Sequence, residues 1–325
     1  MKFNHWLLAA LLSTSLVGCG SDDDNDTNPA APQTPNGGNV DSGDSGNGDS
    51  GDDGIDEARL NQLFPKTTRV FGITLAGSAT TPDDKLLHAA NVMAEYLDND
   101  EDGNADNQAV VDQLVQSKAR LLMAADGDEL ETLFRQLFDI ADMGSSEDDD
   151  DSAEEPEGGD AIQDLLADEV NPGSAGGQFD GTLEEVLHLI THVGYAQVYP
   201  DVFGEEPDSA IADAMDAARG GRFLELPDSY PNDAWYTYDD DTCEYDCMVT
   251  EYTYWALTSV LGAQQFNGRL EQIQDEWQLN TADLVRTRDA AVYSILTNDQ
   301  YKLPTQLPDG QYAASQFEVT NSAAN

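Results

Sequence analysis

Two histidines, His188 and His192, stand four residues apart in the segment EEVLHLITHVGY, residues 184–195. Imidazoles at this spacing share one face of an α-helix and can reach the same metal ion. Glu185 falls on that face one turn before His188, where a carboxylate can bind the metal or orient an imidazole. The pattern therefore predicts a helix that carries a site for a divalent transition metal.

A third protein ligand is expected from the segment VTEYTYWALTSVLG, residues 249–262, which has the composition of a second helix. Glu251 stands near its start, among aromatic residues. Two other interpretations stay open. The histidines could be buried and held by carboxylates without any metal. Glu185-x-x-His188 also has the spacing of a di-iron bundle site, although the chain has no second Glu-x-x-His.

His188, His192 and Glu251 together resemble the ligand set of the gluzincin metallopeptidases. That family has an early sheet, a His-Glu-x-x-His helix and a downstream helix that supplies a glutamate ligand. The resemblance covers about residues 68–265. It implies zinc bound by these three residues and, if the site is active, metal-assisted hydrolysis of a peptide or protein substrate.

The sequence departs from the family at Leu189, which stands where the family has the glutamate that activates zinc-bound water. Leucine cannot accept a proton, so it cannot act as the general base. Glu184 or Glu185 could replace it from one turn earlier, and Glu185 is the candidate catalytic residue. A residue in that position is better suited to support a ligand than to act as a base. A metal-binding relative without proteolysis is therefore favoured over an active protease.

A second cation site is predicted in DNDEDGNADN, residues 98–107, where carboxylates alternate and Gly103 turns the chain. This pattern matches the first half of an EF-hand loop, but Ala109 stands where that loop has its bidentate glutamate. The loop therefore resembles those of thrombospondin type 3 and dockerin modules, which implies structural calcium. The expected calcium ligands are Asp98, Asp100, Asp102, Asn104 and Asp106.

The start of the chain resembles a bacterial lipoprotein leader. Lys2 precedes an apolar run that ends in Leu16-Val17-Gly18-Cys19, which resembles a lipobox. The resemblance implies a signal peptide over residues 1–18 and a lipid on Cys19. Gly20 and Ser21 follow without an aspartate, which implies the outer membrane. Residues 19–57 are rich in Asp, Gly, Ser and Asn and predict a disordered acidic tether.

Residues 58–325 are expected to form a single metal-binding domain, with a disordered acidic insert at about 144–160. An exported chain favours a disulfide between Cys243 and Cys247 over a metal site that uses both thiolates. The formal net charge of −50 argues against nucleic acid as a partner.

The element pattern predicts an α+β fold, mostly helical. Strands are expected at 68–77 and 119–125, and helices at 83–98, 182–199, 249–264 and 281–298. Thr182 and Glu185 are expected to form a capping box at the helix start. The leading functional hypothesis is a surface-anchored lipoprotein with a zincin-like site, either a metallopeptidase or an inactive relative. The alternative is a non-enzymatic, calcium-binding surface or adhesion lipoprotein.

Overall fold

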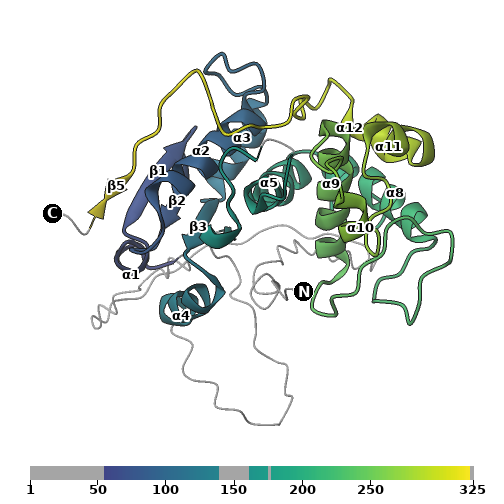
Figure 1. Cartoon of the computed structure of the whole chain (residues 1–325), viewed down its shortest axis with the longest axis horizontal. Helices are drawn as coiled ribbons and strands as arrows, with labels where there is room; N and C mark the ends of the chain where they lie inside the picture. The colour runs from purple at the N-terminus through teal and green to yellow at the C-terminus, as the bar shows by residue number, and fades with distance from the viewer. Residues whose placement is uncertain (1–54, 139–160, 175–176, 323–325) are drawn as a thin grey trace, which may run out of the picture.

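The computed structural model describes residues 55–138, 161–174 and 177–322. The predicted signal peptide, Cys19, the tether up to residue 54 and the acidic insert lie outside these residues. The described chain has the predicted α+β fold, with 47% helix, 10% strand and a small sheet followed by a helical half. Figure 1 shows the sheet at one side of the molecule and the helical half at the other. None of its described helices is both long and apolar enough to cross a bilayer.

The sheet has five strands in the order β4-β3-β2-β1-β5. Both neighbours of β1 run antiparallel to it, while β2, β3 and β4 run parallel to one another. The strands are β1 (Lys66–Val70), β2 (Ile73–Gly77), β3 (Arg120–Ala124), β4 (Ile162–Leu166) and β5 (Thr320–Asn321).

The single strand predicted at 68–77 is wrong, because the chain turns back on itself in the middle of that segment. Phe71 and Gly72 have φ angles of 48° and 95°. Two consecutive residues at positive φ form the turn that joins twisted antiparallel strands most tightly. Gly72 adopts this conformation without strain, and β1 and β2 pair directly on either side of the turn.

Helices cover both faces of the sheet. Strand β3 is buried throughout, so its side chains alternate between two apolar layers. Leu121 and Met123 face the main core, whereas Leu122 and Ala124 face a smaller cluster. The smaller cluster is closed by α1 (Glu57–Leu63) and α4 (Gly127–Leu137). The main core is shared with α2 (Asp83–Leu97), α3 (Gln108–Gln116) and α5 (Gly181–Leu189).

The helical half is built around α9 (Tyr245–Leu261), which is buried over most of its length. Helix α5 packs against β4 and α2 on one side and against α9 on the other. The remaining described α-helices are α6 (Ala196–Val198), α7 (Pro200–Phe203), α8 (Ala210–Arg219), α10 (Arg269–Ile273), α11 (Ala282–Arg288) and α12 (Ala290–Leu296). Helix α5 is therefore the element through which the sheet meets the helical half.

The helix predicted at 281–298 is divided at Asp289, which caps the start of α12. Its side chain accepts hydrogen bonds from the Val292 amide, the Trp235 indole and the Tyr252 hydroxyl. Because a buried carboxylate needs several donors, these contacts end α11 and begin a new helix.

The helix that carries the two histidines is not regular. Asp180, rather than the predicted Thr182, caps α5, because its side chain accepts a hydrogen bond from the Thr182 amide. After Leu189 the α-helix continues as a π-helix over Ile190–Tyr195. The Thr191 hydroxyl donates to the Leu187 carbonyl, 2.9 Å away, within the turn where the α-helix ends. A wider turn changes the direction of every later side chain, including that of His192.

The C-terminal segment returns from α12 across the end of α2 and adds β5 to the edge of the sheet (Figure 1). It makes polar contacts with the end of α2 and the loop after it. The Tyr312 hydroxyl donates to Asp98, and the Asp309 amide donates to Glu95. These contacts join the last part of the chain to the predicted calcium loop.

The π-helix fits closely against α3, and Gly194 lies at the contact. A Cβ atom at this position would lie 2.7 Å from Cγ1 of Val110. We expect Gly194→Ala to destabilise the fold by about 1–3 kcal/mol through overpacking. Gly127→Ala is the matched control, because its new methyl group would meet nothing closer than 3.9 Å. Equal melting temperatures for the two variants would contradict this account of the π-helix.

Candidate metal centre

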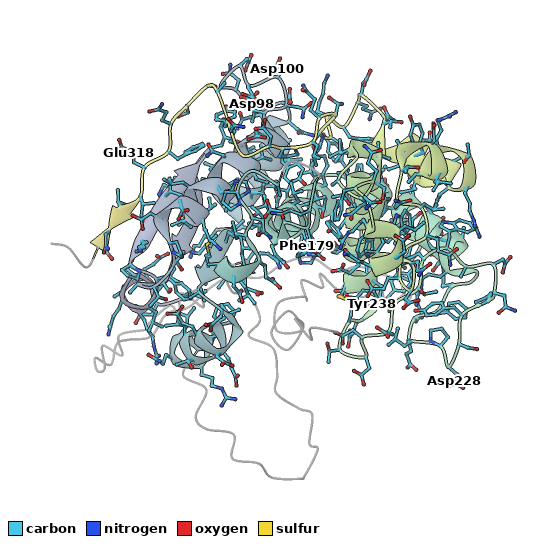
Figure 2. All side chains as sticks on the ribbon, viewed as in Figure 1. Asp98, Asp100, Phe179, Asp228, Tyr238 and Glu318 are labelled. Atoms are coloured by element: carbon cyan, nitrogen blue, oxygen red, sulfur yellow. A yellow bond between two sulfur atoms is a disulfide. The ribbon has the colours of Figure 1, made fainter. Side chains whose placement is uncertain are left out.

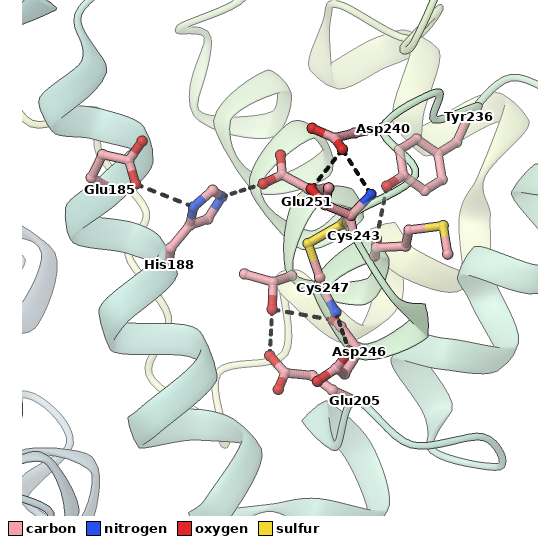
Figure 3. The surroundings of a disulfide bond; sticks show 12 residues. Glu185, His188, Glu205, Tyr236, Asp240, Cys243, Asp246, Cys247 and Glu251 are labelled. Carbon is pink, nitrogen blue, oxygen red and sulfur yellow. Dashed lines mark hydrogen bonds and ion pairs between the residues drawn. A yellow bond between two sulfur atoms is a disulfide. The ribbon is translucent and has the colours of Figure 1, made fainter. Parts of the chain in front are cut away.

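Helices α5 and α9 bring His188 and Glu251 face to face. The distance from His188 Nε2 to Glu251 Oε1 is 3.4 Å, and each residue is only 2% exposed. Glu184 joins them from the turn of α5 before His188, and one ligand atom from each of the three lies within 4.8 Å of the others. Figure 3 shows Glu185, His188 and Glu251 in a row between the two helices. The predicted pairing of His188 with the downstream Glu251 is thus present in the structure.

The spacing of these atoms fits metal ligation. Zinc bonds to nitrogen and oxygen are about 2.0–2.1 Å long, so two ligands at a tetrahedral angle lie about 3.4 Å apart. The separation of His188 Nε2 and Glu251 Oε1 has this value, whereas a good N–H···O hydrogen bond is nearer 2.9 Å. Glu251 Oε1 is buried and accepts no hydrogen bond from the residues that the structure describes. A cation between the two groups would give the Glu251 oxygen a partner.

Glu185 lies on the other side of the His188 ring. Its Oε2 is 3.6 Å from His188 Nδ1 and accepts a hydrogen bond of 2.7 Å from the Gln163 amide. One imidazole nitrogen therefore faces a carboxylate while the other faces the candidate metal position. This arrangement is common where a carboxylate orients a metal-binding histidine. Glu185 therefore lies on the side of the His188 ring opposite to Glu251, where a carboxylate could orient the imidazole.

His192 does not join this group. Its Nδ1 lies 2.5 Å from Glu205 Oε2, and the other oxygen of Glu205 accepts a hydrogen bond from Thr250. The Glu205 carboxylate raises the pKa of His192 to about 9, which favours the protonated imidazole at neutral pH. A protonated imidazole cannot bind a metal. The group whose ligand atoms lie close together is therefore Glu184, His188 and Glu251, and the predicted ligand His192 lies outside it.

The position of Glu184 beside His188 could have been predicted from the sequence. Glu184 precedes His188 by four residues, the same spacing as that between His188 and His192. A carboxylate at i−4 reaches the same ion as readily as an imidazole at i+4. In the structure His192 lies within the π-helix and pairs with Glu205, and the residue pattern of the segment does not predict that π-helix. Glu205, the partner of His192, lies in the segment between α7 and α8. No pattern in the sequence predicts that it pairs with His192.

The three glutamates lie in an environment that opposes their ionisation. Burial, and then the charge of Glu185, raises the pKa of Glu184 to about 8. Burial also raises the pKa of Glu185 and of Glu251, while it lowers the pKa of His188. The cluster therefore combines several carboxyl groups with a neutral imidazole. A divalent cation would supply the positive charge that the ionised carboxylates need.

The predicted disulfide is present between Cys243 and Cys247 (Figure 3). It links the segment before α9 to the first turn of that helix, four residues before Glu251. Both sulfur atoms are used by the bond, so the alternative of a thiolate metal site is not supported. Tyr254 lies one turn after Glu251 on α9. Its ring contacts the His188 ring edge-on, with the two ring centroids 5.5 Å apart. The bridge and the aromatic contact therefore fix the start of α9 beside His188.

The predicted calcium loop forms a second candidate site. Asp98, Asp100 and Asp102 have ligand oxygens within 4.8 Å of one another, and Asp98 is fully buried. The two other predicted ligands have different contacts. Asp106 accepts a hydrogen bond from the Asn99 amide, and the Asn104 side chain donates to Asp102. The three alternating aspartates therefore form the core of this site.

Comparisons with known protein families, with curated proteins and with solved structures find no match for this chain. The resemblances to gluzincins and to dockerin-type loops therefore stay predictions. What the chain can do depends on the geometry of its own residues, of which the buried contact between His188 and Glu251 is the most specific.

The raised pKa of Glu184 predicts how the metal-free protein responds to pH. The folded-state value of about 8 exceeds the ordinary value of 4.5, so protonation stabilises the fold. That stabilisation is complete below pH 4.5 and is lost as the pH rises through 8. In EDTA, we expect Glu184→Gln to become more stable relative to the wild type across this range, because glutamine cannot ionise. Thermal melts at a series of pH values measure the difference, and parallel curves would contradict it.

Proposed function

We propose that this protein is a lipid-anchored surface protein that binds a divalent transition metal, most favourably zinc. His188 and Glu251 are the central ligands, Glu184 is the third, and Glu185 orients His188. The observation that carries this proposal is the buried 3.4 Å contact between His188 Nε2 and Glu251 Oε1. It has the spacing of two zinc ligands and joins two helices from different parts of the chain.

Metal binding without peptide hydrolysis fits the site better than protease chemistry. The Leu189 side chain has no atom that can accept a proton, and it is buried in the hydrophobic core. Glu185 is held by Gln163 beside the far nitrogen of His188. A general base must contact the metal-bound water, which this position does not favour. The metal then has one of two roles. It stabilises the contact between α5 and α9, or binding the metal is itself the function of the protein.

Calcium is the second ion that we propose, with a structural role in the loop after α2. Three carboxylates whose oxygens lie so close together repel one another without a cation. Desolvation raises the pKa of Asp100 most, and the neighbouring charge of Asp102 raises it further. The C-terminal segment contacts the same loop through Tyr312 and Ala313. Calcium would therefore stabilise both the loop and the segment that crosses it.

Attachment to the outer membrane is proposed from the leader and from Cys19. The apolar run before a small-residue site and a cysteine is typical of exported lipoproteins. The disulfide between Cys243 and Cys247 agrees with an oxidising compartment. We therefore place the metal-binding domain outside the cytoplasm, joined to the lipid by the acidic tether.

Zinc loading tests the central proposal. Wild-type protein, stripped with EDTA, reloaded and dialysed, should retain about one zinc ion per chain by elemental analysis. His188→Ala and Glu251→Gln should each weaken zinc binding by more than about tenfold, and Glu185→Gln by about 10–100-fold. His192→Ala is the matched control and should bind like the wild type, because this histidine pairs with Glu205. Equal losses in His192→Ala and His188→Ala would contradict the ligand set.

A casein-hydrolysis assay of the zinc-loaded protein separates metal binding from proteolysis. We expect no activity above that of His188→Ala, since the site has no suitably placed base. Hydrolysis that is abolished in both His188→Ala and Glu185→Gln would instead favour the metallopeptidase interpretation.

Calcium should raise the melting temperature of the wild-type protein, and Asp100→Asn should remove most of that rise. Because the chain carries a net charge of −50, any divalent cation also screens its self-repulsion. Magnesium at the same concentration controls for screening, and Asp228→Asn controls for the loss of one exposed carboxylate. Equal stabilisation of both variants by calcium would contradict a specific site.

A further inference from the structure

Arg219 is the last residue of α8 and is fully buried, with 0% of its surface exposed. The segment that follows it, residues 220–244, is described throughout and forms no helix or strand apart from an isolated bridge at Tyr236. Figure 2 shows Asp228 of this segment on a side of the molecule away from Asp100 of the predicted calcium loop. Arg219 and the segment after it are therefore separate from that loop.

The Arg219 guanidinium uses only one of its three nitrogens in a hydrogen bond. Nη1 donates to the Phe223 carbonyl, 2.9 Å away. Nε and Nη2 are buried and have no hydrogen-bond partner among the residues that the structure describes. These two nitrogens form one edge of the planar guanidinium, and together they can donate to both oxygens of one carboxylate. The edge suited to bidentate binding of an anion is therefore without a protein acceptor.

The carboxylate one turn earlier on α8 is engaged by other donors. Asp216 accepts hydrogen bonds from Arg222 Nε, 2.7 Å away, and from the Tyr245 hydroxyl, 3.1 Å away. An arginine keeps its positive charge in a protein, and a buried charge without a hydrogen-bonded counter-ion costs free energy. An anion bound at the Nε and Nη2 edge would remove this cost for Arg219.

Two aromatic rings of the irregular segment lie against the guanidinium. Its central carbon is 5.6 Å from the ring centroid of Phe223 and 5.6 Å from that of Tyr230. The two rings also contact each other edge-on, with centroids 5.9 Å apart. Ring faces attract the cation but leave its in-plane N–H groups without acceptors. Both residues are partly exposed, so a movement of their side chains would open a path from solvent to Arg219.

We propose that Arg219 binds a small monocarboxylate, whose two oxygens accept hydrogen bonds from Nε and Nη2. The planar carboxylate matches the guanidinium edge, and its single negative charge balances one arginine. A dianion such as sulfate would place a second negative charge near Asp216, which precedes Arg219 by one turn. The protein repels anions in general, because its net charge is −50. Saturable binding of a carboxylate would therefore indicate a specific site.

An NMR titration of the ¹⁵N-labelled protein with sodium acetate, followed through the arginine Nε–H signals, tests this proposal. Acetate replaces sodium chloride at constant ionic strength, and EDTA is present so that no metal binds the acetate. We expect one Nε–H signal to shift and saturate, with a Kd on the order of 1 mM. Acetamide has the same shape without the charge and should bind at least about tenfold more weakly. Arg219→Lys keeps the charge but lacks the planar edge, so it should lose this signal and weaken acetate binding by at least about tenfold.

Arg222→Lys is the matched control, because this arginine is already paired with three aspartates. It should keep the shifting signal and bind acetate like the wild type. If Arg219→Lys does not fold, Phe223→Leu assigns the signal instead, because loss of the ring beside the guanidinium should move that Nε–H signal before acetate is added. The proposal is overturned if no arginine signal shifts saturably, if acetamide shifts it equally, or if the shifting signal belongs to Arg222.

Discussion

The buried contact between the His188 imidazole and the Glu251 carboxylate is the constraint on which the architecture depends. Each group loses its hydration when α5 packs against α9, and that loss costs free energy unless a partner replaces the water. Glu184 borders the same position, and Glu185 lies beside the other nitrogen of the His188 ring. Without a cation, the carboxyl groups must hold protons at pH values where they would otherwise ionise. With a divalent ion, the same groups would form a compact and satisfied polar centre in an apolar core.

The rest of the fold holds the two sides of this contact in place. Helix α5 is packed on the sheet and is capped by Asp180, which also contacts His88 of α2. Helix α9 begins at the disulfide, one turn before Glu251, and ends at Gly262 in the left-handed conformation. Since α5 and α9 belong to the two halves of the structure, an ion at their contact would join those halves directly.

The sequence predicts the parts of this arrangement that follow from periodic patterns. Alternating and helical spacing of apolar residues predict α2, β3, α5 and α9, and the predicted pairing of His188 with Glu251 depends on them. The details missed are those set by packing. The π-helix after Leu189 packs closely against Val110 at Gly194, and His192 within it pairs with Glu205. The turn at Phe71–Gly72 divides one predicted strand into two, because a single glycine gave a weaker signal than the apolar run around it.

A crystal structure of the zinc-loaded protein, with anomalous diffraction recorded on both sides of the zinc absorption edge, tests the central claim most directly. The account predicts one strong anomalous peak between α5 and α9, about 2.0–2.2 Å from His188 Nε2 and from an oxygen of Glu251. His192 should stay in its ion pair with Glu205. A peak coordinated by His192, or no peak beside His188 in fully loaded crystals, would contradict the proposed centre.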